Sequence, residues 1–182
     1  MITFITGGGR SGKSRFAREK ALLFPRKVFL ATAVATDPEM AKRIEKHKKE
    51  REFDFVTVEE PLRLAKAIRT AAPSADVIVV DCLTFWLNNL FHYLGKAYSQ
   101  EIEDFLKVLE EKPTSLILVT NEINMGVIPK DPLSREFVDC QGWLNQEAAR
   151  RADEAILMVA GIPQVLKSNQ VTTHEEIIQN LQ

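Results

Sequence analysis

The stretch GGGRSGKS has the residue types and the spacing of a phosphate-binding loop. Four residues separate Gly7 from Gly12, and Lys13 and Ser14 follow directly. In such a P-loop the backbone N–H groups and the positive end of the next helix bind phosphate oxygens, the lysine reaches the β- and γ-phosphates, and the serine can ligate Mg²⁺. A glycine-rich turn that happens to precede Lys-Ser is the alternative. The predicted phosphate-binding residues are Gly7, Gly8, Gly9, Arg10, Ser11, Gly12, Lys13 and Ser14.

A carboxylate that can complete a metal site closes another apolar run, VIVVDC at 77–82. Asp81 could hold Mg²⁺ together with Ser14, or it could simply cap the following helix. Beside a P-loop we favour the metal role. These residues predict a nucleoside triphosphate with Mg²⁺, and they leave the acceptor open.

One of the three histidines lies on a strongly basic segment, EMAKRIEKHKKER. Met40, Ile44 and His47 are spaced to share one face of a helix. The ordinary interpretation is a half-exposed histidine on a charged helix. The alternative is a nucleophile, because neighbouring cations favour the neutral imidazole and stabilise charge that develops on an attacked phosphorus. The spacing permits the second role without establishing it.

Further polar and aromatic residues keep two interpretations each. Asn121 and Glu122 end the run LILVTNE, where the carboxylate could accept the proton of a substrate hydroxyl or bind a metal, or could brace the next loop. The remaining candidates are Arg135, Asp139, Asn145 and Gln146, as ion-pairing or as subunit or substrate contacts, and Trp86, Phe91 and Trp143, as core, interface or ring-binding residues.

Strand-like and helix-like segments alternate along the chain, which predicts an α/β fold with a largely parallel sheet covered on both faces. Strands are expected at 1–6, 27–33, 55–60, 77–82 and 116–122, and a terminal β-hairpin around Gly161-Ile162-Pro163. Helices are expected at 14–24, 37–51, 61–72, 84–94, 99–111, 134–152 and 173–182. Asp37 reads as the N-cap of the second helix, with Pro38 at its first position.

The totals predict one domain over residues 1–182 in a soluble, cytoplasmic protein. A net charge of −1 gives no overall field that attracts nucleic acid or an anionic membrane. The two cysteines, Cys82 and Cys140, fit a reducing compartment. The short run before the glycines does not read as a signal peptide, and no apolar run is long enough to insert in a membrane.

Several longer motifs occur together and in a fixed order. GGGRSGKSRFARE is followed by RIEKHKKER at 43–51, EEP at 59–61, VTNEINMGVIP at 119–129, the pattern R-x-F-x-D-x-x-G-x-x-N-Q at 135–146, AD at 152–153 and GIP at 161–163. Over about residues 2–167 this order resembles the bifunctional adenosylcobinamide kinase/adenosylcobinamide-phosphate guanylyltransferase family of cobalamin biosynthesis. The two long motifs after residue 118 are more specific than the P-loop.

The resemblance implies two reactions on a corrinoid, a RecA-like P-loop fold and a homo-oligomer, typically a trimer. ATP or GTP would phosphorylate the aminopropanol hydroxyl of adenosylcobinamide. GTP would then transfer GMP through a histidine, at the position of His47, to adenosylcobinamide phosphate. By position, Ala31, Thr32 and Ala33 would line the nucleotide pocket, and the residues in contact with the guanine nucleotide would be Lys48, Lys49, Glu50, Arg51, Glu59 and Asp81.

Two departures from the family pattern leave the attacking group untouched. Lys46 stands where many relatives have a second histidine, and Phe53 and Phe55 stand where many have a tryptophan. Two other functions stay open from the residues alone. One is a simple small-molecule kinase that uses Lys13, Ser14 and Asp81, and the other is a RecA-like ATPase module, against which the lack of a basic stripe with interleaved aromatics argues.

Overall fold

The computed structural model of the chain describes residues 1–49 and 54–168, apart from the side chains of Arg43 and His47. The strands are β1 (Ile2–Gly7), β2 (Lys27–Ala31), β3 (Val56–Glu59), β4 (Val77–Asp81), β5 (Ser115–Val119), β6 (Glu154–Val159) and β7 (Ile162–Ser168). The helices are α1 (Lys13–Ala21), α2 (Pro38–Lys49), α3 (Leu64–Ala71), α4 (Leu83–Leu94), α5 (Tyr98–Glu111) and α6 (Pro132–Arg151), with short 3₁₀ turns at η1 (Ala72–Ser74) and η2 (Gly95–Ala97).

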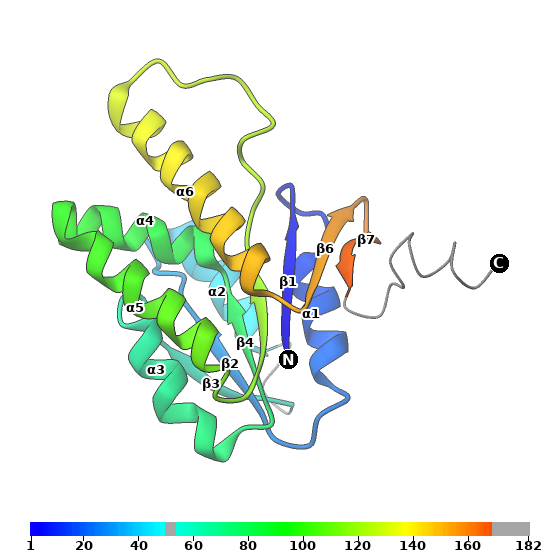
Figure 1. The fold of residues 1–182 in the computed structure, drawn as a ribbon. Helices are drawn as coiled ribbons and strands as arrows, with labels where there is room; N and C mark the ends of the chain where they lie inside the picture. Colours follow the sequence, from blue (N-terminus) through cyan, green and yellow to red (C-terminus); the bar gives the residue numbers. More distant parts are fainter. Residues whose placement is uncertain (50–53, 169–182) are drawn as a thin grey trace, which may run out of the picture.

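The described strands form one seven-stranded sheet in the order β3-β2-β4-β5-β1-β6-β7 (Figure 1). All neighbours are parallel except β6 and β7, which form the predicted antiparallel hairpin. Because β1, β2 and β4 run in parallel, their carboxyl ends reach the same edge of the sheet. The P-loop follows β1 at that edge, so the topology places it next to the end of β5 and on the same edge of the sheet as the ends of β4 and β2.

Helices cover both faces of the sheet, as the uninterrupted apolar strands predict. Successive residues of β4 point to opposite faces, so Ile78 and Val80 belong to one apolar cluster while Val77 and Val79 belong to another. The first cluster is closed by α3, α4, α5 and α6, and the second by α1. Within the described residues no helix combines the length and the apolar character needed to span a membrane.

Local side-chain contacts explain where several helices begin. Asp37 accepts a hydrogen bond from the Met40 N–H at 2.8 Å, which confirms it as the N-cap of α2. Helix α3 begins at Leu64 rather than Pro61, because the Glu60 carboxylate accepts hydrogen bonds from the backbone N–H groups of residues 62 and 63 and holds a turn there. Asp131 caps α6 by accepting from the Ser134 N–H at 2.8 Å.

Other boundaries differ by a few residues from the prediction. Strand β5 ends at Val119 instead of Glu122, and β7 already includes Ile162 and Pro163. Proline is accommodated there because β7 pairs only with β6 among the described strands, so it is an edge strand that leaves one side without ladder hydrogen bonds. The helix expected at 173–182 lies outside the described residues.

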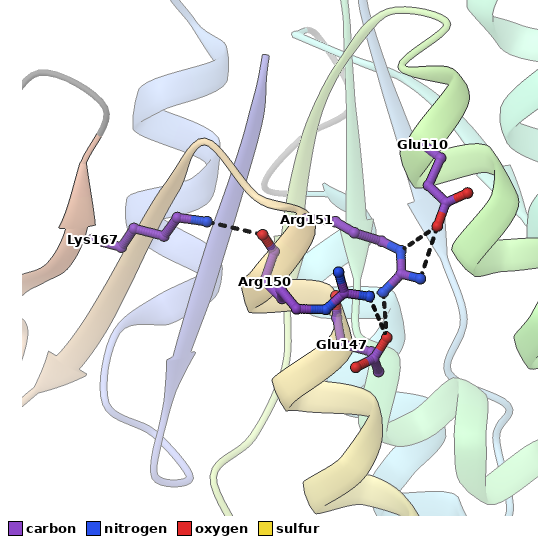
Figure 2. A network of polar contacts seen from close by, with 5 residues as sticks. All are labelled: Glu110, Glu147, Arg150, Arg151 and Lys167. Atoms are coloured by element: carbon purple, nitrogen blue, oxygen red, sulfur yellow. Dashed lines mark hydrogen bonds and ion pairs between the residues drawn. The ribbon is translucent and has the colours of Figure 1, made fainter.

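The carboxyl end of α6 is tied to its neighbours by a polar network (Figure 2). Arg151 pairs with Glu110 of α5 at 2.8 Å and also with Glu147 one turn earlier in α6. Lys167 of β7 donates to the backbone carbonyl oxygens of residues 149, 150 and 152, at 3.2, 2.9 and 2.6 Å. A cation at this end of a helix also interacts favourably with the helix dipole. The network therefore fixes α6 against both α5 and the terminal hairpin.

Candidate nucleotide-binding site

The loop between β1 and α1 has the backbone shape that its glycines allow. Gly7 and Gly12 have φ values of 147° and 94°, and a Cβ on Gly7 would lie 2.4 Å from the Met158 carbonyl oxygen. Side chains are therefore excluded at both positions. The turn of the β6–β7 hairpin packs on the loop, where the Gly161 N–H donates to the Ser11 carbonyl oxygen at 3.0 Å. The hairpin thus helps to fix the backbone of the phosphate loop.

Lys13 is a buried cation at the start of α1. Its Nζ donates to the Gly8 carbonyl oxygen at 2.6 Å and lies 3.5 Å from the Ser11 Oγ. Burial lowers the pKa of the Lys13 ammonium from its usual 10.5, although Cys82 and Asp81 nearby oppose the shift. A phosphate oxygen could therefore replace the Gly8 carbonyl oxygen as the acceptor for the Lys13 ammonium.

Ser14 and Asp81 lie together, as the sequence predicts. The Ser14 hydroxyl donates to Asp81 Oδ1 at 3.3 Å, across the edge of the sheet between α1 and the end of β4. A hydroxyl and a carboxylate are the hard oxygen ligands that Mg²⁺ accepts, usually together with phosphate oxygens and water. In the described part of the chain no cluster of three or more His, Cys, Asp or Glu could hold a metal by itself. The pair therefore fits a metal that arrives with a nucleotide.

A cavity of about 560 Å³ opens over the loop. From the sheet, the lining residues are Ala31 at the end of β2 with Ala33 just after it, Glu59 at the end of β3, Asp81 at the end of β4, and Val119 at the end of β5 with Asn121 shortly after it. The remaining lining residues are Gly9, Arg10, Ser11, Gly12, Lys13, Ser14, Arg15, Met40, Ile44, Cys82 and Phe85. This volume lies within the usual range for small-molecule sites.

Helix α2 reaches this cavity through Met40 and Ile44. Position 47 is one turn further along the same helix, on the stripe that contains positions 40 and 44. The side chain of His47 lies outside the described residues, so its proposed role depends on the placement of the helix.

Of the two described basic residues that directly follow position 47, Lys48 contacts a residue that lines the cavity, and Lys49 contacts its own helix. Lys48 Nζ pairs with Glu59 Oε1 at 3.1 Å, which joins α2 to β3. Lys49 lies 3.9 Å from Glu45 on the same helix. Glu50 and Arg51, which the sequence also predicts as nucleotide contacts, lie outside the described residues.

Residues 31–33, at the end of β2 and just after it, have different surroundings. Ala31 and Ala33 line the cavity, whereas Thr32 is fully buried. The Thr32 hydroxyl donates to the Cys82 carbonyl oxygen at 2.8 Å and accepts from the Cys82 N–H at 2.9 Å. Thr32 therefore fixes the end of β2 to the end of β4 beneath the cavity. Burial, with Asp81 as a second cause, raises the pKa of the Cys82 thiol to about 12, so this cavity-lining thiol stays protonated.

Comparison with known proteins agrees with this site. The model of the family described as cobinamide kinase / cobinamide phosphate guanyltransferase matches residues 3–166. The chain belongs to this family. It is 43% identical over 169 residues to the bifunctional adenosylcobalamin biosynthesis protein CobP of Pseudomonas aeruginosa, covering 92% of this chain and 98% of CobP. The bifunctional adenosylcobalamin biosynthesis protein CobU of Salmonella typhimurium is 35% identical over 176 residues, covering 89% of this chain and 97% of CobU.

Among solved structures, the ATPase EscN of the enteropathogenic Escherichia coli type III secretion system has a TM-score of 0.56 and 13% identity. The match covers 97% of this chain and 50% of EscN, so the chain spans about half of the EscN length. At this identity the likeness concerns the fold alone, and it agrees with the predicted α/β fold with a largely parallel sheet.

Two residues of the motif VTNEINMGVIP have different roles in this family member. Asn121 lines the cavity, while Glu122 Oε1 accepts from the Asn124 N–H at 3.2 Å within the loop. Of the two roles that the sequence left open, the structure therefore places Glu122 as a brace of the loop. The loop also contacts α6, because the Asn124 amide covers the space where a Cβ of Gly142 would lie.

The second long motif lies on α6. Arg135 donates to the backbone carbonyl oxygens of Pro129 and Lys130 at 3.1 and 2.5 Å, so it holds the loop that precedes the helix. Asp139 and the half-exposed Trp143 line a second cavity of about 600 Å³, between α5 and α6. Trp86 is fully buried, and the ring centroids of Phe91 and Tyr98 stack 4.5 Å apart. Trp86 and Phe91 therefore belong to the apolar cluster on the face of the sheet that α4, α5 and α6 cover.

Sequence reasoning did not single out Arg15, Phe85 or Val119 as cavity residues. Val119 is indistinguishable in the sequence from the other apolar residues of its strand. Phe85 lies near the start of α4, shortly after Asp81 ends β4. This position after a strand-ending carboxylate is the only signal in the sequence that could have predicted Phe85 as a cavity residue.

Proposed function

We propose that this protein phosphorylates the aminopropanol hydroxyl of adenosylcobinamide with ATP or GTP, and then transfers GMP from GTP to form adenosyl-GDP-cobinamide in cobalamin nucleotide-loop assembly. One observation carries the proposal: the chain belongs to the cobinamide kinase and guanyltransferase family, and its phosphate loop, Asp81 and α2 line one cavity. Both nucleotides are cytoplasmic metabolites, so we also propose a cytoplasmic location.

In the kinase step the substrate hydroxyl oxygen attacks the γ-phosphorus, and the bond from that phosphorus to the bridging oxygen breaks to release ADP or GDP. The hydroxyl proton is released to solvent. Catalysis of phosphoryl transfer rests mainly on positioning and on stabilisation of charge. The backbone amides of residues 8–14 and the Lys13 ammonium would supply that stabilisation. Mg²⁺, held by Ser14 and Asp81 with the phosphate oxygens, would neutralise charge on the β- and γ-phosphates.

In the guanylyl step a neutral ring nitrogen of His47 attacks the α-phosphorus of GTP, and pyrophosphate leaves. A phosphate oxygen of adenosylcobinamide phosphate then attacks the same phosphorus and frees the imidazole. The placement of α2 supports this proposal, because Met40 and Ile44 of the same helix line the cavity. Lys48, Lys49, Glu50, Arg51 and Glu59 are proposed to contact the nucleotide, and cations there would favour the neutral histidine and the developing charge.

The decisive experiment follows the α-phosphorus. Incubation with Mg²⁺ and GTP labelled at the α-phosphorus should give a labelled protein that acid releases and base does not, as expected for a phosphoramidate. His47→Ala should abolish the label, while His92→Ala, at an exposed position of α4, should retain it. A wild-type protein that transfers the γ-phosphate to adenosylcobinamide but takes no label would leave the simple kinase as the function.

We further propose that the protein assembles as a homo-oligomer, in line with the trimers that the family resemblance implies. The loop before α6 exposes Met125, Val127 and Ile128, whose side chains are 81%, 96% and 80% exposed. Several exposed apolar side chains in one loop are typical of a subunit contact. Light scattering of the full chain measures the mass.

A further inference from the structure

A buried polar network lies beneath the end of β5, next to the nucleotide cavity. Thr120 and Gln141 are fully buried and Asn145 is nearly so. The Thr120 hydroxyl donates to Asn145 Oδ1 at 2.9 Å, and Gln141 Nε2 donates to the same oxygen at 2.8 Å. Both donors therefore orient the Asn145 carboxamide, whose Oδ1 accepts and whose Nδ2 must donate elsewhere.

That second donation reaches the main chain of Asn121. Asn145 Nδ2 donates to the Asn121 carbonyl oxygen at 3.1 Å, and the Asn121 N–H donates to Thr84 Oγ1 of α4 at 2.9 Å. The next residue is also fixed, since the Glu122 N–H donates to the Gly7 carbonyl oxygen at 3.1 Å. The backbone at Asn121 is thus held by α4, by α6 and by the first residue of the phosphate loop, although β5 has already ended.

The side chain of Asn121 has a different environment from its backbone. It is half-buried and lines the cavity that also contains Lys13, Ser14 and Asp81. In residues 1–49 and 54–168 nothing hydrogen-bonds its carboxamide. Asn121 follows β5, between β4, which ends at Asp81, and β1, which leads into the loop. Asn121 therefore contributes a carboxamide donor to the cavity that the phosphate loop, Ser14 and Asp81 also line.

We propose that the Asn121 carboxamide donates a hydrogen bond to the terminal phosphoryl group of the bound nucleoside triphosphate. Asn145 is the positioning residue, because it holds the backbone of Asn121 in place. This inference rests on the proposed function, since it assigns a contact within the same nucleotide site. A fixed donor aimed at a phosphoryl oxygen needs no rearrangement when charge moves onto that oxygen. The buried network supplies the fixation, because losing one of its partners leaves polar atoms unsatisfied.

The test compares a triphosphate with a diphosphate. Affinities for β,γ-imido-GTP and for GDP, both with Mg²⁺, are measured by calorimetry in the His47→Ala protein, so that no guanylyl transfer occurs. Asn121→Ala should weaken binding of the triphosphate by about tenfold, the usual effect of one hydrogen bond to a charged group, and leave GDP binding unchanged. Asn88→Ala, at an exposed position of α4, is the matched control and should change neither affinity.

Asn145→Asp separates positioning from packing. The aspartate keeps the shape and the oxygen that Thr120 and Gln141 donate to, but it replaces the donor that faces the Asn121 carbonyl oxygen. We expect a selective loss of triphosphate affinity again, in a protein whose circular dichroism is that of wild type. Should Asn145→Asp not fold, Thr84→Val tests the same point from the other side, because it removes the acceptor of the Asn121 N–H.

Equal weakening of both nucleotides by Asn121→Ala, or no weakening of either, would overturn the proposed contact. The same results in the Asn145 or Thr84 variant would overturn the positioning role. Failure of the proposed function would look different: no histidine adduct and no phosphorylated corrinoid would form in wild-type protein, while the triphosphate-selective effect of Asn121→Ala would persist.

Discussion

Lys13 is a charged residue that the folded protein buries before any phosphate is bound. Its ammonium donates to the Gly8 carbonyl oxygen, and desolvation lowers its pKa. A lowered pKa means that the folded state disfavours the protonated lysine, so at neutral pH the side chain opposes stability. A triphosphate reverses this because its oxygens pair with the cation. At the residue scale, Lys13 therefore lowers the stability of the nucleotide-free fold and raises the affinity for a triphosphate.

Lys13→Met tests whether Lys13 lowers stability while it supports catalysis. We expect phosphoryl transfer to adenosylcobinamide to fall at least about a hundredfold, the usual cost of removing one stabilising donor from a transition state. The melting temperature of the nucleotide-free variant should be no lower than that of wild type, because an incompletely paired buried cation has been replaced by an apolar chain of similar length. Calorimetric melting and an assay with γ-labelled ATP measure the two effects. A variant with a clearly lower Tm would contradict the argument.

At the element scale, the β6–β7 hairpin acts as a support for the phosphate loop. Its turn residue Gly161 has a φ of 82° and donates its N–H to Ser11, while Gly12 approaches it so closely that a Cβ on Gly12 would lie 3.3 Å from the Gly161 Cα. The loop is therefore shaped from two sides, by its own glycines and by a strand pair that follows more than 140 residues later in the chain.

Gly161→Ala should weaken both the fold and nucleotide binding. An alanine at positive φ costs about 1–2 kcal/mol of unfolding free energy, and the strain falls on the N–H that holds the loop. Gly95→Ala provides the control, since Gly95 has a φ of 50°, ends α4 and has open space around its Cβ position. Both variants should unfold at lower urea concentration, and only Gly161→Ala should also weaken GDP binding. Unchanged GDP affinity in Gly161→Ala would show that the hairpin does not support the site.

The sequence predicted the elements well and their mutual contacts poorly. The apolar runs at 77–82 and 116–122 indicated central parallel strands, and the P-loop with Asp81 indicated the phosphate site, because each depends on local pattern. The start of α3 depends on Glu60 side-chain hydrogen bonds that composition does not reveal. The placement of Asn145 beneath Asn121, 24 residues apart, depends on how α6 crosses the sheet. Periodicity along one element carries no information of that kind.

At the scale of the whole molecule, charged groups join parts of the chain that are distant in sequence. Figure 2 shows Arg151 between Glu110 of α5 and Glu147 of α6, and Lys167 of β7 bonded to the end of α6. Hydrogen bonds from Arg150, and then from Arg151, lower the pKa of the Glu147 carboxyl from 4.5 to about 2. Because α6 also carries Asn145, this network at one end of the helix helps to hold the residues beneath the nucleotide cavity.

The lowered pKa of Glu147 predicts how stability responds to acid. A carboxyl whose pKa is lower in the folded than in the unfolded state contributes stability above its unfolded value, and that contribution is lost as the pH falls toward the folded value. At pH 7, Glu147→Gln should therefore have a lower free energy of unfolding in urea than wild type. The difference should shrink between about pH 4.5 and pH 2, because wild-type Glu147 becomes protonated in that window. Glu103→Gln, which makes the same charge change at an exposed position of α5, is the matched control. If the Glu147→Gln difference stayed constant down to pH 2, the carboxylate would not be the group through which α6 is held.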